Sequence, residues 1–478
     1  MTQSLDHIAL LPLYAAAGTV VLVLILELAT GRREAVLAAA ALGGLATAVC
    51  AAAVGGRDTS TLCTSAGCSW VPAPFGTVAA VLFALLTVGV LALSAPALRS
   101  GVAPAGEFCF LLTSSMAGGV VIGYAGDLIT LIVGLETLTL PLYVLVGLRR
   151  FAPREKVTTT GASAAVTFFV ISVVSTAIAL LGAALLFASS GALYLAALHE
   201  VTGPLAALAT VGGTLVVLGF AFKVAAVPLH AWAPTTYDGA PLPIAAYLST
   251  ASKLGGVLAL AAVIARLDTG PLVAVLAVLT MTVGNLVALR QTRMVRLLAW
   301  SSVAQAGYII APLAVGAVGV EAAAAYTTLY VLLEFTAFGV IVALRPAGAD
   351  GGEITSYRGA ARRSPWLGAA LVLAFAGLAG LPPGLAGLFA KVTIVSSLIT
   401  SGWGWLAGVV ALNAVIALAY YVRVAALLYA GPVGVAVADL RPPKLPVAWP
   451  VAAALAAASA FAVIVGFVPQ LLFDSLTR

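Results

Sequence analysis

The sequence of 478 residues contains little charge. Only 8% of its residues are Asp, Glu, Lys or Arg and 62% are hydrophobic, whereas about a quarter of the residues in an ordinary globular domain are charged. The mean hydropathy is correspondingly high, at +1.14. Such a chain has too few polar side chains to cover a water-exposed surface, so the composition excludes a soluble fold.

Cysteine and histidine are also scarce, with four and three residues in the whole chain. Cys50 and Cys109 fall in or near apolar runs, and Cys63 and Cys68 share one polar loop, so no set of four has the spacing of metal ligands. Glycine-rich nucleotide loops and flavin motifs are absent as well. We therefore expect this chain to bind no cofactor or metal ion and to contain no redox centre.

The formal net charge is +6 and the isoelectric point is near 9.2, a balance that also occurs in nucleic-acid-binding proteins. Here the cations lie in short loops between apolar runs and form no separate basic domain, so we expect no nucleic-acid partner. The first apolar run lacks the cationic leader of a cleavable signal peptide, and we interpret it as a retained helix.

The apolar runs are continuous and about 20 residues long, which matches the hydrocarbon thickness of a bilayer at the helical rise of about 1.5 Å per residue. Within lipid, only helices and closed barrels satisfy every backbone N–H and C=O group, and barrel strands are shorter and alternate in polarity. Dividing the chain at its charged and Pro/Gly-rich breaks therefore predicts an all-α membrane protein of about 14 transmembrane helices.

Lysine and arginine residues in the loops indicate the orientation, because cationic loops resist translocation. Most of them fall in alternate loops, and only Arg57, Arg266 and Arg478 fall on the other side. The cation-rich face is expected to be cytoplasmic, which puts both termini outside. Cys63 and Cys68 would then lie on the oxidising side, as either a local disulfide or two free thiols. The cations of the predicted cytoplasmic loops are Arg32, Arg33, Arg99, Arg149, Arg150, Arg154, Lys156, Arg290, Arg293, Arg296, Arg345, Arg358, Arg362, Arg363, Arg441 and Lys444.

Several charged residues fall inside predicted helices or at their edges. A lysine at the centre of a membrane helix costs roughly 3 kcal/mol on insertion scales and is retained only where it faces protein or water. Each residue taken singly is compatible with a structural contact between helices. Together they are more typical of a proton relay, because burial disfavours and pairing favours the charged form, so that both uptake and release of a proton become possible. These residues are Glu136, Lys223, Lys253, Glu334, Lys391 and Arg423.

Two predicted helices are interrupted by proline close to a lysine. Pro228 follows Lys223, whereas Pro382 and Pro383 precede Lys391. Each interruption frees backbone groups that need water or polar partners, which predicts a hydrated path at both places. The reversed order of lysine and proline in the two halves fits inverted-topology repeats.

The chain divides on this basis into four parts. We expect helices 1–3 in residues 1–107, a first inverted repeat with helices 4–8 in 108–266, a second with helices 9–13 in 267–430, and a C-terminal loop with helix 14 in 431–478. Each repeat of five helices would contain one discontinuous helix. The odd number of helices per repeat is what inverts the second repeat relative to the first.

His230 follows the first break and has two interpretations. It could act as a proton shuttle, because histidine changes its charge near neutral pH. It could equally be a hydrogen-bonded structural residue beside the helix break.

These positions carry a resemblance to a known family, the proton-pumping antiporter family shared by respiratory complex I and the Mrp cation/proton antiporters. The likeness extends over residues 108–430, and within the family the sequence is most similar to the N subunits (NuoN) of bacterial complex I. The family landmarks are Leu218, Gly219, Phe220, Lys223, Pro228, His230, Trp232, Pro234, Tyr237, Gly239, Ala240, Pro241, Ala251, Ser252, Lys253, Gly380, Leu381, Pro382, Pro383, Gly387 and Lys391. The features that favour an N subunit are Gly134-Leu135-Glu136, Gln291-Thr292, Arg296-Leu297-Leu298, Ser301-Ser302, Gly307-Tyr308, Ser356-Tyr357-Arg358-Gly359 and Tyr420-Tyr421-Val422-Arg423-Val424.

The resemblance implies a role for each of four residues. Glu136 and Lys223 correspond to the Glu–Lys pair of the family, and Lys253 corresponds to its central relay lysine. Lys391 corresponds to the lysine that exchanges protons with the outside. These four residues are the predicted proton relay.

Three positions depart from the pattern of the family. Thr167 takes the place of a lysine usual in the sixth helix of N subunits, so inward access to the relay is expected to be rewired or partly lost. Gln305 stands where relatives often have histidine. Glu334 is not part of the pattern, and it either restores a titratable site near the central axis or pairs with a neighbour. With His230, these residues are further candidates for the relay.

The resemblance implies an antiporter-like, proton-translocating subunit of NADH:quinone oxidoreductase in the bacterial plasma (inner) membrane. The implied partners are the antiporter-like M subunit, the small membrane subunits K, J, A and H, the peripheral redox arm and membrane lipids. FMN, iron–sulfur clusters and quinone are expected in those partner subunits. Two alternatives stay open, namely an Mrp-type Na⁺/H⁺ antiporter subunit and a structural scaffold whose pumping has decayed.

Overall fold

The structure is a computed structural model of the chain, and it describes residues 5–57, 59–148, 156–199, 201–431 and 447–477. Some cations of the predicted loops lie outside these described residues, namely Arg149, Arg150, Arg154, Arg441, Lys444 and Arg478.

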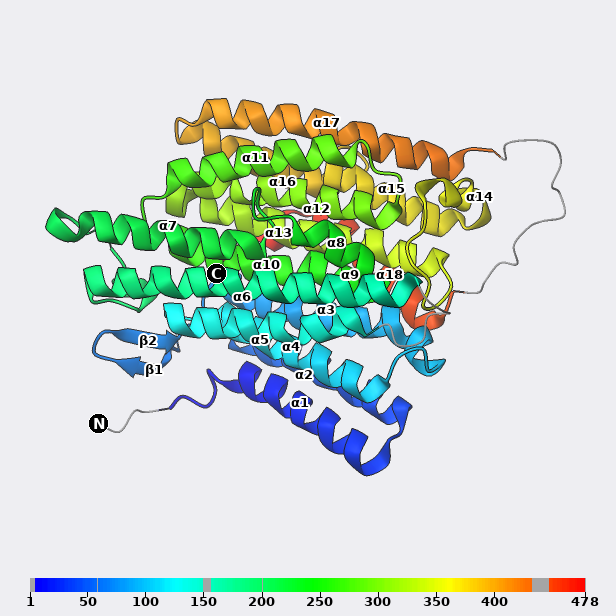
Figure 1. Ribbon diagram of the computed structural model, residues 1–478, viewed down its shortest axis with the longest axis horizontal. Coiled ribbons are helices and arrows are strands. Elements are labelled where there is room, and N and C mark those ends of the chain that lie inside the picture. The colour runs from blue at the N-terminus through cyan, green and yellow to red at the C-terminus, as the bar shows by residue number, and fades with distance from the viewer. Residues whose placement is uncertain (1–4, 58, 149–155, 200, 432–446, 478) are drawn as a thin grey trace.

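Long helices run side by side through the whole molecule (Figure 1). In the described residues, 12 helices are long and apolar enough to cross a membrane, and α15 and α16 are shorter apolar helices. Large hydrophobic side chains such as Leu28, Val133 and Leu412 are exposed on the outside of the bundle, as lipid allows. The prediction of an all-α membrane protein is confirmed, and the count of about 14 spans stays a prediction.

The helices of at least 17 residues are α1 (Leu11–Thr30), α2 (Arg33–Val54), α3 (Pro74–Arg99), α4 (Ala105–Tyr124), α5 (Leu128–Gly147), α6 (Lys156–Ser190), α7 (Ala206–Lys223), α11 (Gly270–Ala288), α12 (Met294–Ile310), α13 (Val320–Leu344), α17 (Gly404–Tyr429) and α18 (Trp449–Phe467). α12 is not one of the 12 candidate spans, whereas the continuous segment Leu242–Ile264 is one of them. The shorter helices are α8 (Trp232–Gly239), α9 (Leu242–Tyr247), α10 (Lys253–Ile264), α14 (Ala360–Arg363), α15 (Pro365–Ala379), α16 (Leu385–Thr400) and α19 (Gln470–Thr477).

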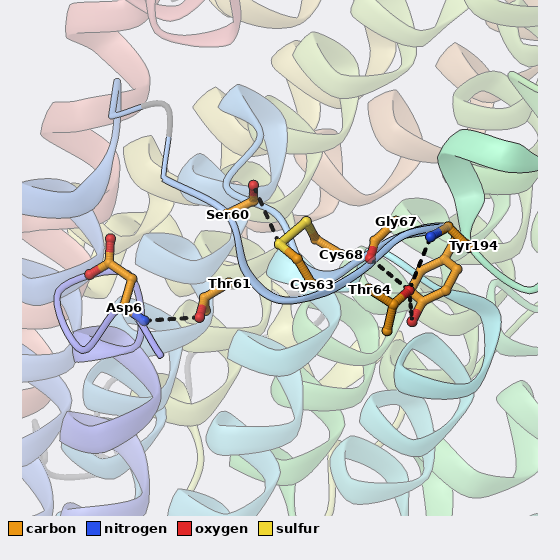
Figure 2. Close-up of a disulfide and its surroundings, with 9 residues drawn as sticks. Asp6, Ser60, Thr61, Cys63, Thr64, Gly67, Cys68 and Tyr194 are labelled. Atoms are coloured by element: carbon orange, nitrogen blue, oxygen red, sulfur yellow. Dashed lines mark hydrogen bonds between the residues drawn. A yellow bond between two sulfur atoms is a disulfide. The ribbon is translucent and has the colours of Figure 1, made fainter. Parts of the chain in front are cut away.

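A small β-hairpin between α2 and α3 was not predicted (Figure 2). It consists of β1 (Thr61–Thr64) and β2 (Gly67–Trp70), which pair antiparallel. A disulfide joins Cys63 and Cys68 across the hairpin, which is one of the two states that the sequence left open. Thr and Trp are common in strands, but the segment is too short to give a clear sequence signal.

Close helix contacts in the core depend on glycine. A Cβ atom at Gly76 of α3 would lie 1.8 Å from the carbonyl oxygen of Gly123 in α4. A Cβ atom at Gly387 of α16 would lie 1.8 Å from the carbonyl oxygen of Gly377 in α15. Backbone therefore touches backbone at both places, which is typical of small residues between membrane helices.

Both predicted interruptions are present. α7 ends at Lys223, and the chain is not helical again until α8 begins at Trp232, with a cis peptide bond between Val227 and Pro228. α15 ends at Ala379 and α16 begins at Leu385, with a cis bond between Pro382 and Pro383. The assignment of these two segments to inverted repeats, and the proposed boundaries of the repeats, stay predictions.

A third irregularity precedes Lys253 and was not predicted. Residues Leu248–Ser252 form one turn of π-helix between α9 and α10. Such turns are rare and occur often at functional sites, because they release backbone groups from the regular helical pattern. Each of the three lysines Lys223, Lys253 and Lys391 thus lies at or close to a helix irregularity.

Candidate functional site

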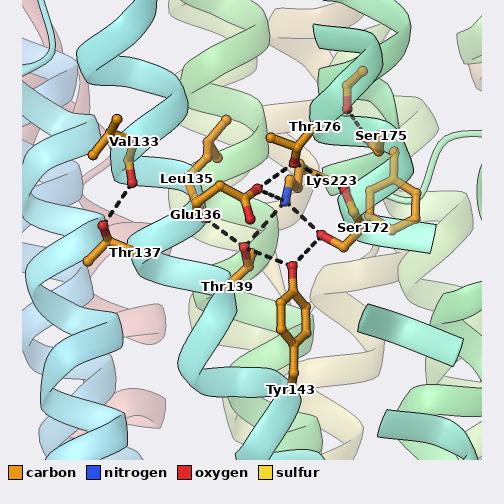
Figure 3. A network of polar contacts seen from close by, with 12 residues as sticks. Val133, Leu135, Glu136, Thr137, Thr139, Tyr143, Ser172, Ser175, Thr176 and Lys223 are labelled. Carbon is orange, nitrogen blue, oxygen red and sulfur yellow. Dashed lines mark hydrogen bonds and ion pairs between the residues drawn. The ribbon is translucent and has the colours of Figure 1, made fainter. Parts of the chain in front are cut away.

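Glu136 and Lys223 form an ion pair between α5 and α7 (Figure 3). The Nζ atom of Lys223 lies 2.8 Å from Oε1 of Glu136. The lysine side chain is only 2% exposed, whereas the glutamate side chain is 27% exposed, beside the exposed residues Val133 and Leu140 of α5. The pair therefore joins the interior of the bundle to its lateral surface.

Hydroxyl groups complete the surroundings of this pair (Figure 3). Lys223 Nζ also donates to Ser172 Oγ at 2.9 Å and to Thr139 Oγ1 at 3.3 Å. Thr176 Oγ1 donates to Glu136 Oε1 at 2.5 Å. The lysine ammonium has three N–H donors, and the structure supplies an acceptor for each of them.

The hydroxyl groups of α6 were not singled out from the sequence. Ser172, Ser175 and Thr176 recur at a spacing of three and four residues in an otherwise apolar helix, which places them on one face. Ser175 donates to the carbonyl oxygen of Gly219 in α7 at 2.6 Å, and the Tyr143 hydroxyl donates to Ser172 Oγ at 2.6 Å. This spacing is the sequence signal that could have located them.

Lys253 occupies a neighbouring helix. A Cβ atom at Gly256, one turn after Lys253 in α10, would lie 3.0 Å from Cβ of Lys223, so α10 packs directly against the end of α7. Lys253 Nζ donates to the backbone carbonyl of Ser302 and, at 2.6 Å, to its hydroxyl group. The Tyr330 hydroxyl lies 2.7 Å from Ser302 Oγ. In the described part of the chain, Lys253 forms no ion pair.

Lys391 lies beside the second break. Its Nζ atom donates to the carbonyl oxygens of Leu378 and Ala379, at 2.8 and 2.9 Å, which the end of α15 leaves without an intrahelical partner. It also lies 4.7 Å from the ring centroid of Tyr308. The negative end of the α15 dipole and the aromatic face both favour a cation here. The break thus supplies the acceptors for this lysine.

Gln305 connects the regions around Lys253 and Lys391. Its Nε2 atom donates to the Leu378 carbonyl at 3.1 Å, and this is the same oxygen that Lys391 contacts. Its Oε1 atom accepts a hydrogen bond from the Tyr326 hydroxyl. Ser302 lies one helical turn before Gln305 in α12, so the acceptor of Lys253 and the neighbour of Lys391 share one helix face.

The remaining candidates lie apart from these hydrogen bonds. His230 lies in the first break, with its ring centroid 5.1 Å from that of Trp300, and its Nδ1 atom has no partner among the described residues. Thr167 is half-buried in α6, more than one turn before Ser172.

Arg423 donates to the carbonyl oxygens of Leu289 and Gln291, at 2.7 and 2.9 Å, just beyond the end of α11. Arg423 therefore has a structural contact, which was one of the two interpretations.

The described residues contain no group of three or more His, Cys, Asp or Glu side chains that is placed to hold a metal ion. Besides the Glu136 carboxylate, the polar groups around the three lysines are hydroxyl, amide and carbonyl groups, and the hydroxyl groups can both donate and accept a hydrogen bond.

Comparison with known families gives a match over the part of the chain that contains these residues. The chain matches the family described as NADH:quinone oxidoreductase/Mrp antiporter, TM, over residues 125–417. That range is more than half of the chain and includes the three lysines and both breaks. The chain belongs to this family. The family membership inferred from the sequence motifs is thereby confirmed.

Relatives within the NADH:quinone oxidoreductase/Mrp antiporter family support the likeness to N subunits. The chain is 56% identical to NADH-quinone oxidoreductase subunit N of Salinispora tropica over 528 aligned positions, which cover 100% of both chains. It is 43% identical to subunit N 2 of Streptomyces griseus, covering 91% of this chain and 84% of the relative. The predicted likeness to bacterial N subunits is therefore confirmed.

Chains of solved structures have the same fold. A chain of respiratory complex I from Thermus thermophilus with bound aureothin superimposes with a TM-score of 0.83 at 27% identity, covering 97% of this chain and 98% of that chain. A chain of the Mrp complex from Dietzia sp. DQ12-45-1b also gives a TM-score of 0.83, at 21% identity and with 98% and 96% coverage. The second likeness shows the fold alone.

Proposed function

We propose that this chain is the antiporter-like, proton-translocating N subunit of a bacterial NADH:quinone oxidoreductase. The observation that carries the proposal is the row of three buried lysines on separate helices, each with polar partners at or near a helix irregularity, and the first of them paired with a glutamate. Lysines buried in a membrane protein are costly and typically mark an ion or proton path. The strong likeness to relatives named as N subunits supports the same assignment.

The Glu136–Lys223 pair is the point at which the relay is controlled. While the pair is intact, the carboxylate stabilises the charged ammonium of Lys223. A change of charge beside the partly exposed Glu136 would weaken the pair, and burial would then favour loss of the Lys223 proton. Because Glu136 lies at the lateral surface, a neighbouring subunit of the complex is in a position to make that change.

The proton then moves along the interior of the bundle. It passes from Lys223 to Lys253 on the helix packed against α7, through bound water. From Lys253, Ser302 and Gln305 lead along α12 to the Leu378 carbonyl and Lys391. Lys391 releases the proton to the outer side of the membrane. The relay thus uses one titratable side chain from each of four helices.

The chemistry that drives this movement belongs to partner subunits. We propose that FMN, iron–sulfur clusters and quinone are held there and that this chain has no redox centre. The partners would be the antiporter-like subunit M, the subunits K, J, A and H, the peripheral redox arm and membrane lipids. The complex would lie in the bacterial plasma membrane, with both termini of this chain outside and with inverted repeats in residues 108–266 and 267–430.

Purification of the chain with its natural partners separates this function from that of an Mrp antiporter, which has the same fold. A tag on the chain should recover a complex that oxidises NADH and has flavin and iron–sulfur absorption. Recovery of small membrane subunits alone, with Na⁺/H⁺ exchange in vesicles, would instead assign it to an Mrp assembly.

Single substitutions separate a relay from a structural scaffold. Glu136→Gln, Lys253→Met and Lys391→Met should each reduce NADH-driven proton pumping in the assembled complex. Arg57→Met is a matched control, because Arg57 is an exposed cation that follows α2. Normal pumping in all three relay variants would identify the chain as a scaffold.

A further inference from the structure

Glu334 is a fully buried acid in the interior of the bundle, and it lies outside the hydrogen bonds described above. It belongs to α13 and its side chain is 0% exposed. Neither of its carboxylate oxygens has a hydrogen-bond partner among the described protein groups. A buried carboxylate without a donor is costly, so this side chain must be neutral, or be solvated by internal water, or exchange between these states.

The neighbours of Glu334 along α13 show which way it faces. Phe335 contacts the position of Gly89 in α3, and Leu333 contacts the position of Gly377 in α15. Successive helical residues point about 100° apart, so Glu334 faces the remaining side, with Tyr330 one turn before it. Tyr330 is hydrogen-bonded to the acceptor of Lys253, Ser302. Glu334 therefore faces the interior, toward Lys253.

Hydrogen bonds point from Lys253 toward this face of α13. Lys253 Nζ donates to Ser302 Oγ, at 2.6 Å. The Tyr330 hydroxyl donates its own hydrogen to the carbonyl oxygen of Ser249, at 2.7 Å, so the Ser302 hydroxyl is left to donate to Tyr330. Lys253 and Glu334 also act on one another electrostatically. The two ionisable groups are thus neighbours without a direct ion pair.

Charge balance distinguishes Lys253 from the other two lysines. Lys223 has a carboxylate at 2.8 Å, and Lys391 has the carbonyl end of a broken helix. Among the described residues, Lys253 donates hydrogen bonds only to the hydroxyl and carbonyl groups of Ser302, and it lies 5.6 Å from the ring centroid of Tyr330. An isolated ammonium in the interior of a membrane protein requires a counterion nearby, and Glu334 is the acid that acts on it.

We propose that Glu334 is the proton-exchange partner of Lys253, and this proposal rests on the proposed function. In one state the pair is Lys253-NH₃⁺ and Glu334-COO⁻, and in the other it is Lys253-NH₂ and Glu334-COOH. One proton leaves Nζ and binds a carboxylate oxygen through Tyr330 or internal water. The net charge of the pair is zero before and after the transfer.

This exchange gives the centre of the relay a place to store a proton. A proton that arrives at the neutral pair from Lys223 makes Lys253 charged beside a neutral Glu334. That positive charge lacks a counterion, and release toward Gln305 and Lys391 restores the neutral pair. The titratable groups that interact electrostatically with Glu334 are Lys253 of α10, Tyr237 of α8, Tyr326 and Tyr330 of α13, and Tyr421 of α17.

Infrared difference spectroscopy of the assembled complex tests the exchange directly. Wild-type complex cycled between oxidised and NADH-reduced states should show a carbonyl band of a buried carboxylic acid, and Glu334→Gln should remove it. Glu321→Gln is the matched control, because Glu321 is an exposed glutamate of the same helix, and it should keep the band. If the difference spectrum of Glu334→Gln is the same as that of the wild type, the proposal is overturned.

Pumping provides the second readout. Glu334→Gln should lower the rate of NADH-driven proton pumping by roughly tenfold or more, because a neutral amide leaves Lys253 without an exchange partner. If that variant does not assemble, Tyr330→Phe replaces it and should slow pumping by removing the hydroxyl group of α13 that bonds to Ser302, the acceptor of Lys253. Normal pumping in whichever variant assembles would overturn the proposal.

Lys223→Met in the same assay separates this inference from the proposed function. Loss of pumping in Lys223→Met together with normal pumping in Glu334→Gln overturns the exchange alone. Normal pumping in Lys223→Met overturns the relay itself.

Discussion

Gln305 and Lys391 donate hydrogen bonds to the same carbonyl oxygen, that of Leu378. This oxygen lies near the end of α15, so the second helix break couples α12 to α16 through a single acceptor. A change in the charge of Lys391 therefore acts on the hydrogen bond of Gln305, and through the same helix on the surroundings of Ser302. The break is the structural link between the central and outer parts of the proposed relay.

Gln305→Leu should slow proton transfer to Lys391. The substitution removes both the donor to Leu378 and the acceptor of the Tyr326 hydroxyl, while the volume of the side chain changes little. We expect NADH-driven pumping to fall severalfold while NADH oxidation by the detergent-solubilised complex persists. Gln291→Leu is the control, because Gln291 is only half-buried and its amide donates to the nearby Val287 carbonyl at the end of α11. Equal pumping in the two variants would contradict the role of Gln305.

Thr176→Val should weaken the Glu136–Lys223 pair. The hydroxyl group of Thr176 donates to Glu136 Oε1 at 2.5 Å, and a hydrogen bond to a charged group contributes about 1.5–3 kcal/mol. We expect assembly to be retained and the ratio of protons pumped to NADH oxidised to fall. Thr137→Val is the control, because Thr137 is exposed on α5 and bonds only to the Val133 carbonyl within its own helix. A normal ratio in Thr176→Val would show that the hydroxyl is dispensable.

Gly380→Ala should displace the side chain of Lys391 and so have a larger effect than backbone strain alone. Gly380 has a φ of +80°, and an added Cβ would lie 2.8 Å from Cδ of Lys391. Gly402 has a φ of +81° with nothing within 4 Å, so Gly402→Ala reports the strain alone, about 1–2 kcal/mol. We expect Gly380→Ala to lower both the melting temperature and the pumping rate of the purified complex more than Gly402→Ala does. Equal effects would mean that the packing of Lys391 against Gly380 is unimportant.

Cys63 and Cys68 should resist alkylation until a reductant is added. The structure joins them by a disulfide in the hairpin between α2 and α3, whereas Cys50 and Cys109 are free. Mass spectrometry of denatured protein treated with N-ethylmaleimide measures all four at once, with the two free cysteines as internal controls. Labelling of Cys63 and Cys68 without reductant would contradict the disulfide.

Much of the fold follows from composition and from a few prolines. The scarcity of charge and the length of the apolar runs predict the helices, and Pro228 and Pro382 mark both interruptions correctly. The hairpin and the π-helical turn before Lys253 were missed. Both are short, and each depends on tertiary contacts: the hairpin hydroxyl of Thr64 bonds to Tyr194 from a distant loop, and Tyr330 bonds to the carbonyl oxygen of Ser249 inside the turn.

The sequence predicts the charged residues of the site but not the hydrogen bonds that connect them. Glu136 and Lys223 are far apart in the sequence, and the structure brings them together as the family resemblance implied. Their hydroxyl partners were not predicted, because a single Ser or Thr in an apolar helix usually donates to a backbone carbonyl of the same helix. The acceptors of Lys391 are backbone carbonyls, which no residue type can reveal.

The most direct test of the relay is the number of protons pumped per NADH oxidised by complex that carries Lys223→Met, reconstituted into proteoliposomes. Methionine is unbranched and nearly as long as lysine but cannot carry the proton, so electron transfer should continue with a clearly lower ratio of protons pumped to NADH oxidised than in wild type and in Arg57→Met. A ratio equal to that of wild type, in complex shown to be fully assembled, would contradict proton transfer through Lys223.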